Sequence, residues 1–197
     1  MSKISVPATN NYCPQTLFLY GTYDEQKKPN FGLFCWLSYC WDKELKVMAC
    51  IGDNKLTKDR IKKNGIFSAN LVTEPLLPLA DYMGSTSGYK QGKMDVNLKL
   101  EKGQMLDVPV LVESPVVFEL CVEQFIPLEE SSDILICNIK NLLLDEKLVY
   151  KTKTVEEKLK EIAPVTTTCS TYFSWEGNKM GKWGDVKEAF LKSQDKK

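Results

Sequence analysis

The residues best suited to chemistry lie between Asp53 and Lys58, where a polar turn leads into a short helix predicted over Leu56–Asn64. Thr57 is a suitable N-cap, because its hydroxyl can accept a hydrogen bond from a free amide of the first turn. These amides, with Lys55 and Lys58 beside them, could bind an anion such as a phosphate. A solvated, well-capped surface helix explains the same residues, and this segment alone favours that plainer interpretation.

The chain contains no histidine, so the commonest general base and metal ligand is missing. No two of its seven cysteines have the two-residue spacing of redox dithiols and zinc knuckles. We interpret them as reduced core residues and leave only the pair Cys35 and Cys40 open. We therefore predict neither a catalytic side chain nor a metal site, and expect any reactive atoms to come from a bound cofactor.

The composition is that of a globular protein with a substantial core: 43% of the 197 residues are hydrophobic and 26% are charged. Lysine plus arginine and aspartate plus glutamate number 26 each, which argues against broad binding to nucleic acid or to an anionic membrane. The N-terminus lacks the apolar core of a signal peptide, and no apolar run is long enough to span a bilayer. We expect a cytoplasmic protein.

Alternating apolar residues predict many short strands. The predicted strands are Thr16–Thr22, Phe31–Trp41, Leu45–Ile51, Ile66–Leu71, Val110–Val112, Val116–Phe125 and Asp133–Leu143. Further helices are predicted over Glu74–Met83, Thr154–Ile162 and residues 185–194. Glu119 and Glu123 are expected on the exposed side of a strand. The pattern indicates one mainly β domain over residues 1–197, a barrel with α additions.

Two further segments suggest a binding site. The predicted strand Phe31–Trp41 is unusually aromatic and places Trp36 and Ser38 on one face. Core packing explains this face, but it also suits the wall of a pocket for a flat aromatic ligand. The loop Gly84–Lys93 is rich in glycines and hydroxyls, and could either cover an anionic ligand or form a mobile surface turn.

A series of short motifs occurs in order along the chain. It comprises Gly21-Thr-Tyr-Asp24, Pro29-Asn30, Trp36-Leu-Ser-Tyr-Cys-Trp41, Lys55-Leu-Thr-Lys58, Gly65-Ile-Phe-Ser-Ala-Asn-Leu71 and Leu79-Ala-Asp-Tyr-Met-Gly-Ser-Thr-Ser-Gly88. The series resembles the flavin reductase-like, FMN-binding split-barrel family, and most closely its flavoredoxin-type branch. The likeness extends from Thr16 to Gly184, which gives a domain core of about residues 14–184.

The resemblance implies a split β-barrel homodimer with one FMN in each subunit near the interface. Carried onto the matching positions, it predicts the cofactor-binding residues. These are Lys55, Leu56, Thr57 and Lys58 at the phosphate; Asn30, Trp36, Leu37 and Ser38 along the isoalloxazine; Asn70 and Leu71 near the ribityl chain; Lys93 near the flavin or its phosphate; and Phe173 as a cover, with Tyr172 and Trp175 as rivals. The segments 89–92 and 166–168 depart from the family pattern.

The implied function is that of an FMN-dependent oxidoreductase. One form is an NAD(P)H:flavin oxidoreductase that releases reduced FMN, with NADH or NADPH as the donor. The other is a flavoredoxin-like electron carrier that keeps FMN and exchanges electrons with a partner protein. Two alternatives from other classes are a non-catalytic flavin- or small-ligand-binding module and a β-barrel interaction protein without a cofactor, in which the Trp36 face is simply core.

Overall fold

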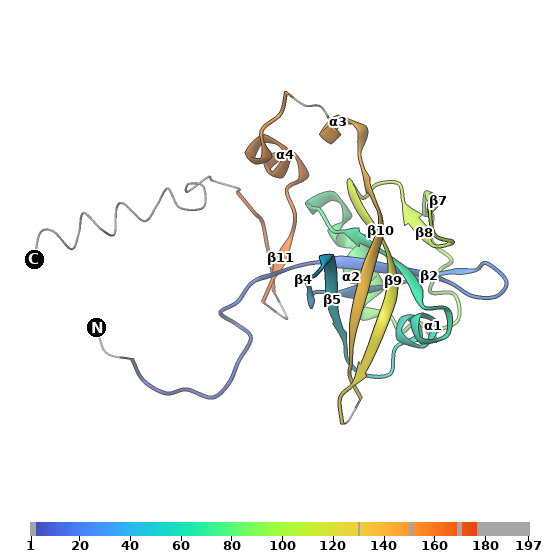
Figure 1. The fold of residues 1–197 in the computed structure, drawn as a ribbon, viewed down its shortest axis with the longest axis horizontal. Helices are drawn as coiled ribbons and strands as arrows, with labels where there is room; N and C mark the ends of the chain where they lie inside the picture. Colours follow the sequence, from blue (N-terminus) through green and yellow to red (C-terminus); the bar gives the residue numbers. More distant parts are fainter. Residues whose placement is uncertain (1–2, 130, 150–151, 169–170, 177–197) are drawn as a thin grey trace, which may run out of the picture.

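The computed structural model describes residues 3–129, 131–149, 152–168 and 171–176 (Figure 1). The predicted helix at 185–194 lies outside the described residues, as does Cys169.

A seven-stranded antiparallel sheet forms the centre of the fold, with the strands in the order β3-β2-β6-β9-β10-β5-β4. These strands are β2 (Phe18–Tyr23), β3 (Pro29–Phe34), β4 (Leu37–Asp42), β5 (Glu44–Ile51), β6 (Ile66–Leu71), β9 (Val116–Pro127) and β10 (Asp133–Leu144). Two small sheets join β1 (Gln15–Thr16) with β11 (Thr166–Thr167) and β12 (Tyr172–Phe173), and β7 (Leu100–Lys102) with β8 (Pro109–Leu111).

The connection between β3 and β4 curls this sheet. The two strands lie at opposite edges, yet only Cys35 and Trp36 separate them in the chain. Three steps of about 3.8 Å between consecutive Cα atoms reach at most about 11 Å, so the two edges must approach each other at this point. The sheet is therefore bent into a barrel that is open along one seam.

The prediction of a single strand over Phe31–Trp41 was wrong for the same reason. The segment divides into β3 and β4, and at the break the amide of Cys50 donates to the carbonyl of Trp36 at 2.9 Å. Residues 34–37 are all apolar, so the periodicity contains no signal that the chain changes partner strands here.

The described part of the chain has five helical segments beside the sheet: α1 (Leu56–Asn64), the 3₁₀ turn η1 (Glu74–Leu76), α2 (Leu77–Ser85), α3 (Glu146–Val149) and α4 (Val155–Ile162). α1 has the predicted bounds and ends at Gly65, whose left-handed φ of 71° suits glycine. α4 begins with a reciprocal capping box between Thr154 and Glu157. None of the described helices is both long and apolar enough to cross a membrane.

Thr57 is not the N-cap of α1, contrary to the prediction. Lys55 occupies that position with extended backbone angles, and its side chain makes no capping hydrogen bond. The Thr57 hydroxyl instead accepts from the side-chain amide of Asn30 at 2.8 Å. Because both side chains are buried, this bond satisfies groups that water cannot reach, whereas a capping bond at the surface would compete with water.

The hydrophobic core has two parts that meet at β2 and β3. One contains Tyr20, Ile61 and Phe67 and packs α1 against β2. The other contains Phe31 and Met83 and packs α2 against β3. This packing fixes the positions of both helices relative to β3. Of the described cysteines only Cys137 is fully buried, Cys13 is exposed, and the others are partly buried, so the core interpretation holds fully only for Cys137.

Glu119 was predicted on the exposed side of a strand and is instead completely buried on β9. Its carboxylate accepts from the amides of residues 104, 105 and 106 at 3.0, 2.9 and 2.6 Å, and from the Asn141 side chain at 2.8 Å. A buried carboxylate that collects several donors in this way serves to hold the loop after β7. Glu123, four residues later, is exposed as expected.

We expect Glu119→Ala to lower the free energy of unfolding by about 3 kcal/mol, because three amides and one side-chain amide would lose a buried acceptor. Urea denaturation measures this loss. Glu101→Ala, which removes an exposed carboxylate from β7, is the matched control and should stay close to the wild type. Equal losses in the two variants would contradict a structural role for Glu119.

Candidate functional site

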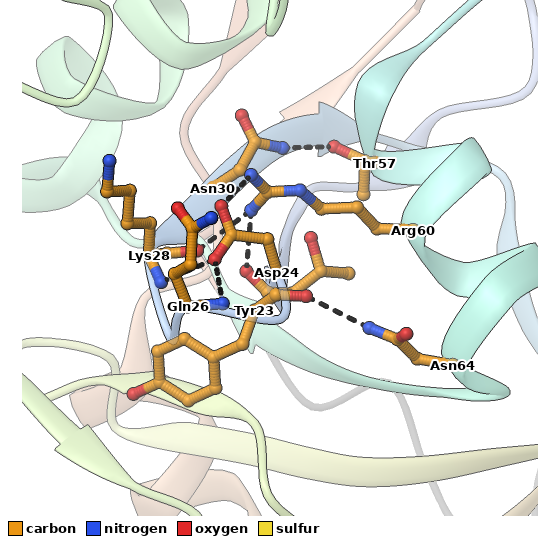
Figure 2. A network of polar contacts seen from close by, with 9 residues as sticks. Tyr23, Asp24, Gln26, Lys28, Asn30, Thr57, Arg60 and Asn64 are labelled. Atoms are coloured by element: carbon orange, nitrogen blue, oxygen red, sulfur yellow. Dashed lines mark hydrogen bonds and ion pairs between the residues drawn. The ribbon is translucent and has the colours of Figure 1, made fainter.

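The position of α1 is fixed by the hairpin between β2 and β3 (Figure 2). Arg60 donates to the carbonyls of Thr22 and Lys28 at 3.4 and 2.9 Å and pairs with Asp24 at 3.1 Å. Burial lowers the pKa of the Arg60 guanidinium, and the Asp24 carboxylate partly opposes this shift. One turn later the Asn64 side chain donates to the Tyr23 carbonyl at 2.9 Å. These contacts hold the last turns of α1 and so direct its N-terminus toward β3.

A polar cavity of about 230 Å³ lies at that N-terminus. One wall is the start of α1, from Asn54 to Thr57, and the facing wall is the end of α2 with the loop Gly84–Gly88. Gly32, Leu33 and Phe34 of β3 and the side chains of Met83 and Lys93 complete the lining. Free helix amides, hydroxyls and an ammonium group thus surround one small space, which is a donor set for an anion.

Lys93 is the most unusual residue of this cavity. Its side chain is buried, and its ammonium group donates to the carbonyls of Phe31 and Met83 at 2.7 and 2.9 Å. No carboxylate pairs with it within the described part of the chain. Burial, followed by repulsion from Lys55, lowers the pKa of Lys93 to about 8. A buried cation with two carbonyl acceptors has one further N–H for an external anion.

Asn30 supplies a second unsatisfied group beside the same helix end. Its Nδ2 is used by Thr57, but its buried Oδ1 has no hydrogen-bond partner among the residues that the structure describes. A Cβ on Gly88 would lie 3.2 Å from this oxygen and 2.7 Å from the Cβ of Leu56, so only glycine lets the loop approach α1 this closely. Buried polar groups without partners are rare in folded proteins and suggest a missing ligand or water.

A wider and more open cavity of about 440 Å³ lies beside the polar one. Leu33, Phe34 and Lys55 line both, so the two spaces adjoin each other. The wider cavity is further lined by Leu17, Cys35, Trp36, Cys50, Gly52, Asp53, Thr167 and Tyr172. It lies at the seam where β3 leaves for β4, and it offers aromatic and aliphatic walls beside a polar end.

The structure brings some of the predicted cofactor residues together and separates others. Lys55, Leu56, Thr57 and Lys93 line the polar cavity, Trp36 lines the wider one, and Asn30 lies behind Thr57. Leu37 and Ser38 line a neighbouring apolar hollow, which Trp36 lines as well. Trp36, 48% exposed, thus borders two hollows.

Lys58, Asn70, Leu71 and Phe173 line none of these spaces. The Lys58 ammonium turns to the β9–β10 hairpin, where it donates to the Ser131 carbonyl at 2.5 Å and lies 3.7 Å from the Asp133 carboxylate. Asn70 uses its side chain inside the protein, donating to Leu19 O and Ser68 Oγ and accepting from Leu111 N, all at 2.9 Å. Leu71 belongs to the core.

The family resemblance predicted Phe173 as the aromatic cover of the flavin and Tyr172 only as a rival. In the structure, Tyr172 is the one that lines the wider cavity. The two are neighbours on β12 and therefore point to opposite faces of the strand. The Tyr172 hydroxyl donates to the carboxylate of Asp81 on α2 at 2.6 Å. Burial, with this hydrogen bond as the second cause, raises the pKa of Tyr172 to about 12, so the phenol keeps its proton at neutral pH. No sequence signal pointed to Asp81.

The described residues contain no group of three or more side chains that could hold a metal ion. They do contain a polar cavity that suits a phosphate, beside an aromatic-lined cavity that suits a ring.

Comparison with known proteins agrees with this geometry. The family model described as flavin reductase like domain matches residues 10–158. The chain belongs to the flavin reductase-like family. The matched region contains the seven-stranded sheet, α1, α2 and all of the polar cavity. A sequence search of curated proteins finds no match.

Solved structures show the fold of this flavin reductase-like chain. Flavoredoxin of Desulfovibrio vulgaris (Miyazaki F) is similar at 24% identity with a TM-score of 0.81, over 94% of this chain and 100% of that one. An FMN-binding protein from Thermus thermophilus gives 16% identity and a TM-score of 0.73, over 92% and 98%. A protein with a split barrel domain from Shewanella frigidimarina gives 16% and 0.76, over 88% and 87%. The predicted mainly β split barrel is thereby confirmed.

We expect Arg60→Lys to lower the free energy of unfolding by about 1 to 2 kcal/mol, because one ammonium cannot reproduce the forked contacts to two carbonyls and a carboxylate. Urea denaturation measures the loss. Lys63→Ala, on the next turn of α1, removes only an exposed pair with Glu25 and should change stability little. A loss in Lys63→Ala as large as in Arg60→Lys would show that the hairpin holds α1 in some other way.

Proposed function

We propose that this protein is an FMN-binding redox flavoprotein. The observation that carries the proposal is the buried ammonium of Lys93, which faces the N-terminus of α1 without a carboxylate partner in the described chain and lines a cavity that adjoins a wider aromatic one. Membership of the flavin reductase-like family supports a flavin as the ligand. The total volume of the polar cavity and the adjoining wider cavity lies within the range of about 300 to 1,000 Å³ that is usual for small-molecule sites.

The residues present fit the phosphate of FMN. The amides at the start of α1, the hydroxyls of the loop Gly84–Gly88 and the ammonium groups of Lys55 and Lys93 would hold it. A phosphate dianion would compensate the charge that Lys93 carries without a partner, and desolvated charge-assisted hydrogen bonds are the strong ones. The apolar and aromatic side chains of the wider cavity would exclude water from the ring, with Trp36 and Tyr172 as aromatic neighbours.

Bound FMN would supply the electron-transfer chemistry, taking electrons from a donor and passing them to an acceptor. The protein's own contribution would be to bind and orient the cofactor and to set the charge around it. This division explains how a chain without histidine could serve in redox chemistry. The Tyr172 phenol would stay protonated and keep its hydrogen bond to the Asp81 carboxylate.

We further propose that the donor is NADH or NADPH or a redox protein, and that the chain acts as a homodimer. The feature that supports a dimer is a group of exposed apolar side chains on the outer strands. They are Tyr39 and Trp41 on the edge strand β4 and Leu45 on the neighbouring β5, which pairs with Trp41 and shares its face of the sheet. Large exposed apolar patches of this kind commonly mark contact surfaces between proteins.

The test of the function has two steps. The purified protein is incubated with FMN, excess flavin is removed by gel filtration, and the absorption spectrum is recorded. Oxidation of NADH and NADPH is then followed with and without added free FMN. Retained flavin without nicotinamide turnover favours a carrier, and turnover that requires free FMN favours a reductase. A protein that binds no flavin would contradict the proposal altogether.

The proposal predicts a defined pH range for FMN affinity. The phosphate becomes a dianion above its second pKa of about 6. Lys93 in the free protein loses its proton around its pKa of about 8. Because the dianion needs the protonated ammonium, affinity should be highest between these values and fall above pH 8 by up to about tenfold per pH unit.

Isothermal titration calorimetry from pH 5.5 to 9.5 measures this profile. Lys93→Gln should bind FMN more weakly at pH 7 and lose the fall above pH 8. Riboflavin, which has no phosphate, should show no such fall with the wild type. A wild-type profile that is flat to pH 9.5 would contradict the role of Lys93.

A further inference from the structure

The segment at residues 89–92 places a tyrosine beside the polar cavity, where it bridges two of the cavity's walls. The segment follows directly on the wall formed by Gly84–Gly88 and consists of tight turns, in which Lys90 N donates to Ser87 O at 3.0 Å and Lys93 N to Lys90 O at 3.3 Å. Gly92 adopts a left-handed φ of 80°. These turns lead the chain from the loop wall back to the buried Lys93.

Tyr89 reaches from this segment to the opposite wall. Its hydroxyl donates to the carboxylate of Asp59 on α1 and lies 2.9 Å from Oδ1 of Asn54, which precedes the helix. The hydrogen bond to Asp59, with burial as a smaller cause, raises the pKa of Tyr89. Asn54 and Asp59 lie on either side of Leu56, the residue against which Gly88 packs. The two walls are therefore joined at Gly88 and again at Tyr89.

We propose that Tyr89 is a specificity-determining residue that restricts the ligand to a terminal phosphate monoester. This inference rests on the proposed function. It means that the site accepts FMN and rejects FAD, in which the phosphate is part of a diphosphate that continues to adenosine. A diphosphate leaving the polar cavity on this side would have to displace the Tyr89 side chain. It would also bring its second phosphate beside the carboxylate of Asp59, a repulsion that a terminal monoester avoids.

The test compares the dissociation constants of FMN and FAD by calorimetry at pH 7 for the wild type, Tyr89→Ala, Tyr89→Phe and Gln91→Ala. Gln91 is an exposed, uncharged residue of the same segment and serves as the matched control. We expect wild type and Gln91→Ala to prefer FMN about a hundredfold. In Tyr89→Ala this preference should fall by about tenfold or more, because FAD gains affinity.

Tyr89→Phe separates the two contributions and keeps the proposal testable if the alanine variant does not fold. The phenylalanine ring still fills the space but cannot hold Asp59, so its preference should lie between those of wild type and Tyr89→Ala. A preference that is unchanged in both variants, or a wild type that binds FAD as well as FMN, would overturn the role of Tyr89. A wild type that binds neither flavin would instead contradict the proposed function.

Discussion

The constraint on which the site depends is the two-residue link between β3 and β4. Because Cys35 and Trp36 must connect strands at opposite edges of one sheet, the sheet has to curl until its edges approach. The seam left at that point is where the wider cavity lies, and both linking residues line it. β3 ends at this seam and also forms part of the polar cavity. The same link thus brings the two edges of the sheet together and places the two cavities side by side.

A second constraint is electrostatic. The fold directs the N-terminus of α1 and the ammonium of Lys93 at the same small space, and Lys55 adds a third positive group. In the free protein this arrangement is unfavourable, as the lowered pKa of Lys93 shows. The contacts of Arg60 and Asn64 with the β2–β3 hairpin maintain it, since they fix α1 at its far end. Stability gained outside the site therefore preserves a destabilised group within it, which is common where a ligand later supplies the missing partner.

How far the sequence could predict this structure depends on the range of the interactions involved. α1 and its end at Gly65 follow from local signals and were predicted with the correct bounds. The break at residues 35–36, the bond between Asn30 and Thr57, and the burial of Glu119 depend on partners 13 or more residues away in the sequence. Such partners leave no mark in a local pattern of polar and apolar residues.

The predicted cofactor residues divide in the same way. Lys55 and Thr57 were predicted from the local turn and Leu56 from the family resemblance, and the structure puts all three at the polar cavity. Lys58 differs, because its ammonium has a closer interaction with Ser131 and Asp133. Phe173 and Tyr172 could not be distinguished, since the face of a two-residue strand is decided by what it packs against.

The two ends of the site are built by different interactions and would hold a ligand in different ways. Buried groups surround the polar end: Lys93 and Thr57 are fixed by hydrogen bonds that water does not contest. The wider end is bounded by Trp36 and Tyr172, which are 48% and 36% exposed, and Tyr172 is held there by one hydrogen bond to Asp81. Hydrogen-bond donors that are already in position lose little conformational entropy when a ligand binds, whereas exposed aromatic side chains can still change their conformation. Affinity and selectivity would therefore reside mainly at the phosphate end, and the ring end would stay accessible to the molecules that exchange electrons with it.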